Sequence, residues 1–564
     1  MLANPHIQSI ELALESQFPG SWKRLDATNS HPLKNKVCGW KVDLPAGFVT
    51  CPVVDYLLIV IDTAFPQSQP RIFAPQAFQE TSWPHVEAEG LLCLRSTMIN
   101  SDAGQRVLQH LSWAQELLNF NEKTCRSEFE REFSSYWLNN IPANSNSPAV
   151  ISLLSPNAIS REVVWFYDLS KQRIIVADSR DLLVHWLRNS DHNPSDKEVS
   201  TCWLAWLPSP WVPNEFPTNG IDVLKYIPTQ FTDLKLHPGK ILPVIFGAET
   251  SSGIVLVATI LEGVSEAKLV KGFRNVAAVP KQLIRNSFKA GKVRRCCVYR
   301  VDGSWIHGRD HDSNYPYLAK RKVAIIGCGA IGAAVARLLV QSGVGSFILV
   351  DHDLLSSPNI SRHALGLEYL GVNKATATAA MLKKSFPHIN EPLVINQKIE
   401  YLTPEQLAKL VECDVVVSCG ISYEGDIKID TWRQSLTIPP VFVCAWTEEF
   451  AIAGHAIALL GNDVLSDGFD VQEQVKFKLT QWPAQSHALI VEAGCGNVFQ
   501  PHGIIDLQET INLAAGLVVD ALCGKLPHST RRVWQGKQEE VTKRGGTVLP
   551  TFTHNLTVQE YPWK

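Results

Sequence analysis

The stretch Lys322–Asp351 reads KVAIIGCGAIGAAVARLLVQSGVGSFILVD and decides the fold of its part of the chain. An apolar run from Val323 to Ile326 leads into a glycine pattern, and a helix-forming run then continues until Gly343 ends it. A second apolar run ends at Asp351. Strand, glycine loop, helix and strand in this order predict a nucleotide-binding α/β unit.

The glycine pattern itself consists of Gly327, Gly329 and Gly332. Glycines let the backbone approach a phosphate, and the following helix begins with free N–H groups and the positive end of its dipole. Asp351, at the end of the second strand, is placed to bind a ribose hydroxyl. Taken alone, this pattern favours a dinucleotide such as NAD. Arg362 and Lys374 favour ATP instead, because cleavage between the α and β phosphates develops charge that cations stabilise.

The sequence that follows, DHDLLSSPNISRH and then GVNK, resembles the adenylation domain of the ThiF/MoeB and ubiquitin-activating superfamily. The residues that fall on that family's pattern, in order and spacing, are Asp351, Asp353, Asn359, Arg362 and Lys374. The resemblance covers about residues 300–540. It implies that Asp351 holds the ribose and that Asn359, Arg362 and Lys374 hold the triphosphate of MgATP. The reaction it implies is adenylylation of the C-terminal carboxylate of another protein.

The magnesium ligand is where the chain departs from that family. The family usually carries an aspartate after the strand that reads CDVVVSCG here, and Ile421 stands in its place. Glu424 and Asp426 are the nearby carboxylates that could substitute. The resemblance therefore implies ATP and Mg²⁺, while the residue that holds the metal is left unknown.

Members of the superfamily that pass the activated protein onward use a cysteine as the acyl acceptor. The prediction here is Cys495 in EAGCGNVFQPHG, because two glycines flank it and no apolar stripe surrounds it. A helix is expected to start near Asp506. The cysteines expected to be packed in the interior are Cys328, Cys413, Cys419, Cys444 and Cys523.

A second motif lies near the N-terminus. IDTAFPQSQPRIFAP followed by WPHVEAEGLLCL resembles the ubiquitin-conjugating fold over about residues 1–140. That family places its catalytic cysteine ten residues after the first residue of an H-P-N tripeptide. Here Trp83, Pro84 and His85 occupy the tripeptide, and Cys93 stands ten positions after Trp83. The resemblance implies that Cys93 is a nucleophile, although most free cysteines are small buried hydrophobes. His85 replaces the asparagine, and it too can donate a hydrogen bond to an oxyanion.

Three domains are expected in the 564 residues, and the fold class is multidomain α/β and α+β. Residues 1–145 are predicted to form a ubiquitin-conjugating-like α+β domain that opens with an amphipathic helix. Residues 146–300 read as an α+β linker or interaction domain of unknown role. Residues 301–564 are predicted to form the Rossmann-like adenylation domain. The face expected on the opening helix consists of Ile7, Ile10, Leu14 and Phe18.

Composition narrows the functional class. Lys and Arg total 52 against 55 Asp and Glu, a net charge of −3 that gives no sign of a nucleic-acid partner. The 13 cysteines are scattered without a C-x-x-C pair, which is typical of a reducing compartment and argues against structural zinc. No apolar run reaches the ~18 residues of a membrane span, and the opening residues do not resemble a signal peptide. A cytoplasmic protein is expected.

Both motifs on one chain resemble the bacterial fusions of a ubiquitin-activating-like and a conjugating-like domain, as in CBASS anti-phage operons. That resemblance implies a homodimer that activates the C-terminus of a partner such as the operon's nucleotidyltransferase (a CD-NTase). The acyl group would then pass through two cysteines to an acceptor amine. Two alternatives stay open: a sulfur-carrier adenylyltransferase with a non-catalytic docking domain, and an NAD-dependent oxidoreductase. The presence of Arg362 and Lys374 disfavours a non-catalytic scaffold.

Overall fold

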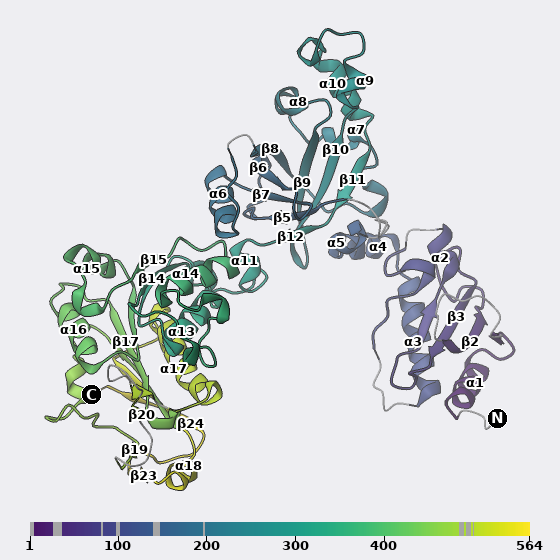
Figure 1. The fold of residues 1–564 in the computed structure, drawn as a ribbon. Helices are drawn as coiled ribbons and strands as arrows, with labels where there is room; N and C mark the ends of the chain where they lie inside the picture. Colours follow the sequence, from purple (N-terminus) through teal and green to yellow (C-terminus); the bar gives the residue numbers. More distant parts are fainter. Residues whose placement is uncertain are drawn as a thin grey trace.

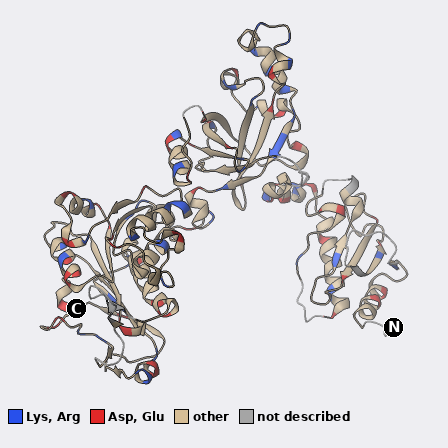
Figure 2. Cartoon of the chain, viewed as in Figure 1, with Lys and Arg blue, Asp and Glu red and all other residues tan. Residues whose placement is uncertain are grey.

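The computed structural model describes residues 5–25, 36–80, 83–96, 102–138, 147–195, 198–483, 490–491, 498–499 and 501–563. Figure 1 shows three bodies that follow one another along the chain, each built around its own larger β-sheet. Charged residues of both signs are interspersed on each body (Figure 2). Within the described ranges, no helix combines the length and the apolar character that crossing a membrane requires.

The first body is a four-stranded antiparallel sheet in the order β1-β2-β3-β4. The predicted face of the opening helix is confirmed, since Ile10, Leu14 and Phe18 are buried and Ile7 packs against their cluster. The proline-rich stretch at residues 65–75 contributes only β4, which lies at the edge of the sheet. Prolines lack a backbone N–H and so are rarely found in central strands. The elements are α1 (Pro5–Gln17), β1 (Trp22–Leu25), β2 (Lys36–Asp43), β3 (Tyr56–Asp62), β4 (Arg71–Phe73), α2 (Pro75–Glu80) and α3 (Ala103–Leu118).

Two short helices come next, α4 (Glu122–Arg131) and α5 (Phe133–Leu138). Their apolar side chains belong to the second body and not to the first. Phe133 and Trp137 are fully buried in its core, and Trp137 Nε1 donates to the carbonyl of Cys296 at 3.1 Å. The domain boundary at residue 145 stays a prediction, but this segment packs onto the sheet that follows it.

The second body is an eight-stranded mixed sheet in the order β11-β10-β9-β8-β6-β7-β5-β12. Its strands match the short β-rich runs that the sequence shows between residues 149 and 262. The strands are β5 (Ala149–Ser152), β6 (Arg161–Asp168), β7 (Arg173–Ala177), β8 (Ser200–Trp206), β9 (Ile241–Thr250), β10 (Gly253–Glu262), β11 (Val293–Cys296) and β12 (Val298–Arg300). The helices are α6 (Arg180–Asn189), α7 (Gly220–Leu224), α8 (Thr229–Lys235), α9 (Glu266–Leu269) and α10 (Lys281–Lys289).

The third body has an eight-stranded sheet in the order β15-β14-β13-β16-β17-β18-β22-β24. The first five are parallel to their neighbours, and the last three continue the sheet antiparallel. They are β13 (Lys322–Ile326), β14 (Ser346–Val350), β15 (Leu393–Ile395), β16 (Val415–Cys419), β17 (Val441–Thr447), β18 (Ala453–Leu459), β22 (Thr530–Gln535) and β24 (Thr557–Pro562). Two small ribbons pair β19 (Thr480–Gln481) with β23 (Thr547–Val548), and β20 (Ile490–Val491) with β21 (Val498–Phe499).

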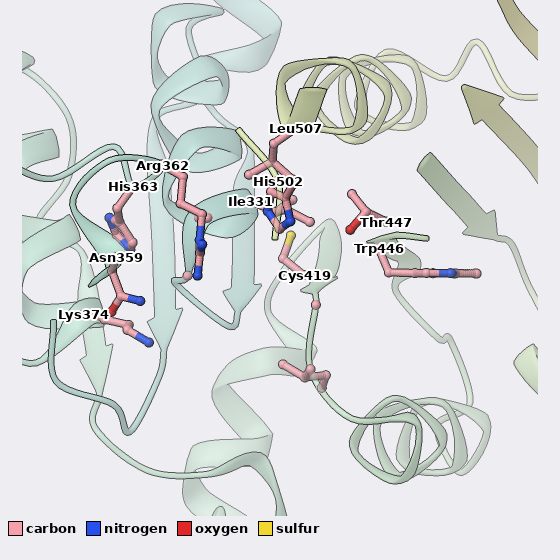
Figure 3. A pocket seen from close by; sticks show the side chains of 14 residues that line it. Ile331, Asn359, Arg362, His363, Lys374, Cys419, Trp446, Thr447, His502 and Leu507 are labelled. Carbon is pink, nitrogen blue, oxygen red and sulfur yellow. The ribbon is translucent and has the colours of Figure 1, made fainter. Parts of the chain in front are cut away.

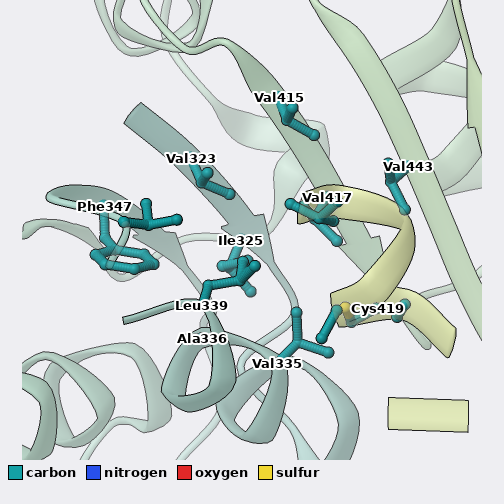
Figure 4. Close-up of a cluster of buried hydrophobic side chains, with 14 of the residues drawn as sticks. Val323, Ile325, Val335, Ala336, Leu339, Phe347, Val415, Val417, Cys419 and Val443 are labelled. Atoms are coloured by element: carbon teal, nitrogen blue, oxygen red, sulfur yellow. The ribbon is translucent and has the colours of Figure 1, made fainter. Parts of the chain in front are cut away.

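Helices cover both faces of this sheet. On one face, Val335, Ala336 and Leu339 of α13 pack against β13, β16 and α17 (Figure 4). A second buried cluster lies on the opposite face. The helices are α11 (Gly303–Ile306), α12 (Tyr315–Leu318), α13 (Ala330–Gln341), α14 (Lys374–Ser385), α15 (Pro404–Val411), α16 (Tyr423–Gln434), α17 (Ile504–Leu522) and α18 (Gln538–Lys543).

The strand order identifies the place for a ligand. From β13 the chain moves to β14 on one side, and it later returns to place β16 on the other side. In open α/β sheets, ligands bind at such a switch point, beyond the carboxyl ends of the strands. The predicted glycine loop begins at this point, directly after β13.

Candidate active site

The three glycines of the loop have two different tasks. Gly327 has φ of +85°, and a Cβ there would lie 2.7 Å from the carbonyl oxygen of Cys419. A Cβ on Gly332 would lie 1.9 Å from the carbonyl oxygen of Gly327. Gly329, the N-cap of α13, has nothing within 4 Å of its Cβ position and therefore faces open space. The first and third glycines close the loop, and the middle one leaves room for a ligand at the N-terminus of a helix.

Asp351 follows β14 and joins the glycine loop to the next turn. Its Oδ2 accepts a hydrogen bond from the Cys328 backbone N–H, and its Oδ1 accepts one from the Asp353 N–H, both at 2.8 Å. Burial raises the pKa of this carboxyl, and the two N–H donors and the charge of Lys374 act against the rise. Each oxygen keeps a second lone pair, so the carboxylate can still accept a ribose hydroxyl.

Two adjoining cavities surround this loop, of about 380 and 290 Å³. Both are lined by Gly329 and Lys374, and the smaller one also by Asp351 and Asp353. Asn359 and Arg362 line the larger one, and Figure 3 shows them with Lys374 on one side of it. The structure thus brings the predicted nucleotide residues together, with Gly327 also lining the smaller cavity and Gly332 beneath the loop. Their roles stay predictions.

The polar residues have local partners that hold them in place. Lys374 is the first residue of α14, and its Nζ lies 3.0 Å from Asp353 Oδ2. Asn359 Oδ1 accepts hydrogen bonds from the backbone and hydroxyl of Ser356, at 3.2 and 2.9 Å. Cationic and amide donors, a helix N-terminus and a buried carboxylate suit the phosphates and ribose of ATP.

His363 also lines the larger cavity, and no sequence motif pointed to it. Its Nδ1 accepts from the Leu365 backbone N–H at 3.2 Å, so Nε2 carries the proton and donates to the Cys328 carbonyl at 2.9 Å. Burial lowers the pKa of His363 to about 4, so the ring stays neutral near pH 7. It braces the glycine loop from below. Only its position beside Arg362 could have drawn attention to it.

The carboxylates considered for magnesium are not turned to the cavities. Asp426 accepts hydrogen bonds from the Ser418 hydroxyl and, at 3.3 Å, from Cys444 Sγ. Burial raises its pKa to about 6. Neither Asp426 nor the exposed Glu424 lines the two cavities, whereas the aliphatic Ile421 lines both. Ile421 cannot ligate a metal.

One group of metal-capable side chains does lie at the smaller cavity. Asp351, His352 and Asp353 each offer a ligand atom, and these atoms lie within 4.8 Å of one another. Oxygen ligands suit Mg²⁺, and the ion usually binds through one or two carboxylates together with substrate phosphates. Asp353, half of whose side chain is exposed, fits that requirement better than Ile421 does.

The cysteine predictions differ in outcome. Cys328, Cys413, Cys419 and Cys444 are buried as expected, and Cys523 is half-buried. Cys93 is exposed and lines a cavity of about 370 Å³ in the first body. Burial and the charges of Glu87 and Glu132 raise the pKa of its thiol. Cys495 lies outside the described residues.

His85 is fixed from several sides beside Cys93. Its carbonyl accepts a hydrogen bond from the Cys93 N–H at 2.9 Å, and its own N–H donates to Tyr136 Oη at 2.6 Å. Its Nε2 lies 3.0 Å from Glu128 Oε2, and its Nδ1 lies 3.7 Å from Glu132 Oε2. The imidazole therefore faces two carboxylates of the α4 segment, the name used here for residues 122–132, which are α4 and the Glu132 that ends it. Its role as an oxyanion donor stays a prediction.

Comparison with known families agrees with both halves of the site. Residues 311–458 match the model of the ThiF family, and residues 34–145 match that of prokaryotic E2 family B. The chain unites a ThiF-family region with a prokaryotic E2-family region. Most residues that line the two cavities lie in the ThiF-family region, with His502 and Leu507 beyond it, and Cys93 lies in the E2-family region.

Several proteins are similar over parts of the chain. An ATP-dependent ubiquitin transferase-like protein Cap2 from Pseudomonas aeruginosa is 38% identical over 251 residues, which are 43% of each protein. This match therefore spans less than half the length of that relative. The Cap2 protein of Vibrio cholerae is 25% identical over 446 residues, 71% of this chain and 72% of that protein.

A solved structure of Escherichia coli MccB with AMPCPP and MccA is also similar. It is 16% identical and covers 44% of this chain and 65% of that one, with a TM-score of 0.31. The ThiF-family and E2-family assignments rest on the two family models.

Proposed function

We propose that the protein activates the C-terminal carboxylate of a partner protein with ATP and transfers the acyl group, through two cysteines, to an amine. The observation that carries the proposal is the pairing on one chain of an ATP-suited cavity with an exposed thiol in an E2-family region. Both Cap2 relatives bear the name ATP-dependent ubiquitin transferase-like protein, which supports the same activity here.

The first step is adenylylation in the ThiF-family region. Asp351 would hold the ribose, and Asn359, Arg362 and Lys374 would hold the phosphates above the open face of Gly329. An oxygen of the partner's carboxylate attacks the α phosphorus, the bond to the β-phosphate oxygen breaks, and pyrophosphate leaves. Lys374 and Arg362 stabilise the charge that develops on the phosphate oxygens. Mg²⁺, when bound, would neutralise part of the same charge, with Asp353 as the proposed ligand.

The next steps move the acyl group. The Cys495 thiolate attacks the acyl carbon and releases AMP, which forms a thioester. Cys93 takes the acyl group by thioester exchange and frees Cys495. An amine then attacks the Cys93 thioester, so the product is an amide and a free thiol. Two thioester steps divide one difficult acyl transfer into easier ones.

The partner class follows from this chemistry as a protein with a free C-terminus. The resemblance to the CBASS fusion proteins makes the nucleotidyltransferase of such an operon the first candidate, with the modification priming its synthase activity. The superfamily resemblance also makes a homodimer the expected assembly. Light scattering on the purified chain tests that expectation directly.

Thioester trapping tests the relay. The chain is mixed with ATP, Mg²⁺ and a candidate partner, and the products are separated on gels without reductant. Two distinct reductant-sensitive adducts are expected. Cys93→Ala should remove the second adduct and keep the first, and Cys495→Ala should remove both. Cys125→Ala is the matched control, since Cys125 is a half-exposed thiol in α4 that the relay does not use.

The two alternatives predict other results. A sulfur-carrier adenylyltransferase with a docking domain would give the same products with and without Cys93. An NAD-dependent oxidoreductase would bind NAD saturably and fail to exchange labelled pyrophosphate into ATP. Pyrophosphate exchange that depends on the partner protein, together with loss of the conjugate in Cys93→Ala, excludes both.

A further inference from the structure

The cavity beside Cys93 has walls from two separately packed parts of the chain. One wall comes from the first body, from the loop that carries Cys93 and Arg95 and from α3, which carries Trp113. The other comes from the α4 segment, and includes Glu128 and Glu132. Figure 1 shows α4 and α5 between the first body and the second. The thiol and the carboxylates that face it therefore reach the cavity from opposite sides of a junction.

The α4 wall is fastened to the second body. Phe129 packs against Tyr136 and Val212, and Arg126 donates to Glu215 Oε1 at 3.0 Å. The Trp137 ring of α5 stacks on Trp211 at 6.0 Å between centroids. The second body thus positions one side of the Cys93 site, which gives part of residues 146–300 a role.

The two carboxylates of this wall differ in their partners. Glu128 pairs closely with Arg131 and also holds His85, so its charge is largely compensated. Glu132 lies farther from the same two groups, at 3.3 Å from Arg131 and 3.7 Å from His85. About a third of its side chain, 35%, is exposed to the cavity and solvent. Its charge acts on the Cys93 thiol, so the carboxylate and the sulfur share one electrostatic environment.

We propose, resting on the relay above, that the α4 wall is the acceptor site of Cys93: Glu132 binds a cationic primary amine, such as a lysine side chain, and takes its proton. A lysine amine is protonated near pH 7, because its ordinary pKa is about 10.4. It must lose a proton before its nitrogen can attack. Glu128 acts through His85 as a positioning residue, and the acceptor class is a primary alkylammonium.

Amide formation at Cys93 replaces a C–S bond with a C–N bond and moves two protons. The ammonium gives one proton to the Glu132 carboxylate, and the free amine attacks the thioester carbonyl carbon. The tetrahedral intermediate collapses, the C–S bond breaks, and Cys93 leaves as a thiolate that takes up a second proton from the nitrogen. The raised pKa of the thiol favours that uptake. Glu132 returns its proton to solvent, which leaves an amide and a neutral thiol.

Other charged groups face the same cavity and shape its response to pH. The charged ones are Arg95, Glu116, Glu128 and Arg131, with Glu87 in the turn before Cys93, and the imidazole of His85 and the thiol of Cys93 are titratable groups beside them. The test therefore compares variants at each pH and does not rely on the pH profile of the wild-type chain alone.

The experiment measures single-turnover discharge of the Cys93 thioester in the full chain. The chain is first loaded with ATP and the partner protein and then chased with free lysine. Glu132→Gln is expected to slow discharge about 100-fold near pH 7, the usual contribution of a positioned base. The deficit should shrink as pH rises, since more of the lysine then arrives as free amine. Glu132→Asp, which keeps the charge, should recover part of the rate.

Two comparisons separate this role from a structural one. Glu130→Gln changes a carboxylate of α4, the helix that Glu132 follows directly. Glu130 pairs with Arg126 and does not line the cavity, so this variant should discharge as the wild type does. Hydroxylamine, which is uncharged near pH 7, should discharge Glu132→Gln at the wild-type rate. Equal loss with lysine and hydroxylamine, or no loss with lysine, overturns the proposal. Failure of the wild type to form a Cys93 thioester overturns the relay instead.

Discussion

Adding a Cβ atom would have different consequences at two glycines of the glycine loop, Gly329 and Gly332. At Gly329 the added methyl group would point into open space at a backbone conformation of φ −78°, which alanine adopts freely. At Gly332 it would meet the carbonyl oxygen of Gly327 at 1.9 Å. The two positions share a motif in the sequence, but only one of them borders the space that a phosphate would fill.

We therefore expect Gly329→Ala to weaken ATP binding by at least about tenfold while the free energy of unfolding changes by less than about 1 kcal/mol. Gly332→Ala should instead destabilise the fold by about 1–3 kcal/mol or more, because the overpacked loop must shift. Calorimetric titration with ATP and urea unfolding measure the two effects. A well-folded Gly329→Ala that binds ATP as the wild type does would contradict this assignment of the loop.

Asp426 gives a second prediction at the residue scale, on pH. Its folded pKa of about 6 lies above the ordinary value of ~3.9, so the folded state holds the proton more tightly. Its stabilising contribution is then full below about pH 4 and is lost as pH rises to about 6. Asp426→Asn removes that loss, and the unfolding free energy of the variant relative to wild type should rise by about 1–3 kcal/mol across this interval.

Urea unfolding at a series of pH values checks this difference. The comparison uses the change with pH and not the absolute value, since the amide cannot accept from both Ser418 and Cys444 as the carboxylate does. Glu424→Gln is the matched control, because that carboxylate is exposed on the same helix. A constant offset between Asp426→Asn and wild type at all pH values would show that Asp426 does not titrate in this range.

Some of the residues at the site could be predicted from the sequence and others could not, for a physical reason. Gly327, Asp351 and Lys374 lie within a local strand–loop–helix pattern, so their spacing already determines which edge of the sheet they share. His363 and Asp426 make their contacts through side-chain direction, which the spacing does not encode. The carboxylates at Glu128 and Glu132 reach His85 from more than 40 residues away, through a packing choice made elsewhere.

At the scale of elements, that packing choice belongs to α5. The apolar pair Phe133 and Trp137 could cover either of the two neighbouring sheets. The pair packs on the second sheet because Trp211 and Phe216 offer it an aromatic surface there. The Cys296 carbonyl also accepts a hydrogen bond from Trp137 Nε1. A buried tryptophan needs such an acceptor for its N–H. Long-range contacts of this kind are outside what local patterns can predict.

The turn after β17 is a second place where separate elements meet, and it lies beside the larger cavity. Glu448 is buried, and its Oε1 accepts from His455 Nε2 of β18 and from the Leu479 N–H, both at 2.8 Å. Its Oε2 accepts from Thr480 N–H at 2.8 Å and from the Thr480 hydroxyl at 2.6 Å. The His455 ring stacks on Trp446, which lines the larger nucleotide cavity. One carboxylate thus ties two strands and the β19 ribbon to the cavity wall.

Glu448→Gln should destabilise the chain by about 2–4 kcal/mol near pH 7, because the amide group would face donors that the carboxylate satisfies. The donors also hold the pKa of Glu448 below its ordinary value. The carboxylate therefore stabilises the fold above about pH 4.3, and that contribution disappears as pH falls through the lower folded pKa.

Urea unfolding of the two chains at neutral and acidic pH measures both effects. Glu449→Gln, the neighbouring residue with a partly exposed bond to Lys478, should cost less than about 1 kcal/mol. Equal losses for the two variants would show that the network around Glu448 has no special part in holding these elements.

At the scale of the whole molecule, the two proposed reactive sites belong to different bodies. Figure 1 places the E2-family body and the ThiF-family body apart, with the second body between them. The second and third bodies also touch through specific contacts, since His185 Nε2 donates to the Ile389 carbonyl at 2.7 Å and Asn189 Nδ2 to the Pro387 carbonyl at 3.0 Å. The two sequence motifs predict an adenylation domain and a conjugating domain, but no local pattern encodes the distance between the bodies that contain them.

Acyl transfer within one chain would then require the contacts of α5 or of α6 to be released. Transfer between two copies would leave both junctions intact, so we expect the thioester to pass from Cys495 of one chain to Cys93 of another. Mixing Cys93→Ala with Cys495→Ala tests this expectation, because each variant alone should make no conjugate and the mixture should make it. The conjugate yield should rise with total protein at a fixed ratio of the two variants. A mixture that stays inactive, while each variant is folded and Cys93→Ala still forms its first thioester, would show that transfer occurs within one chain and that a junction must open.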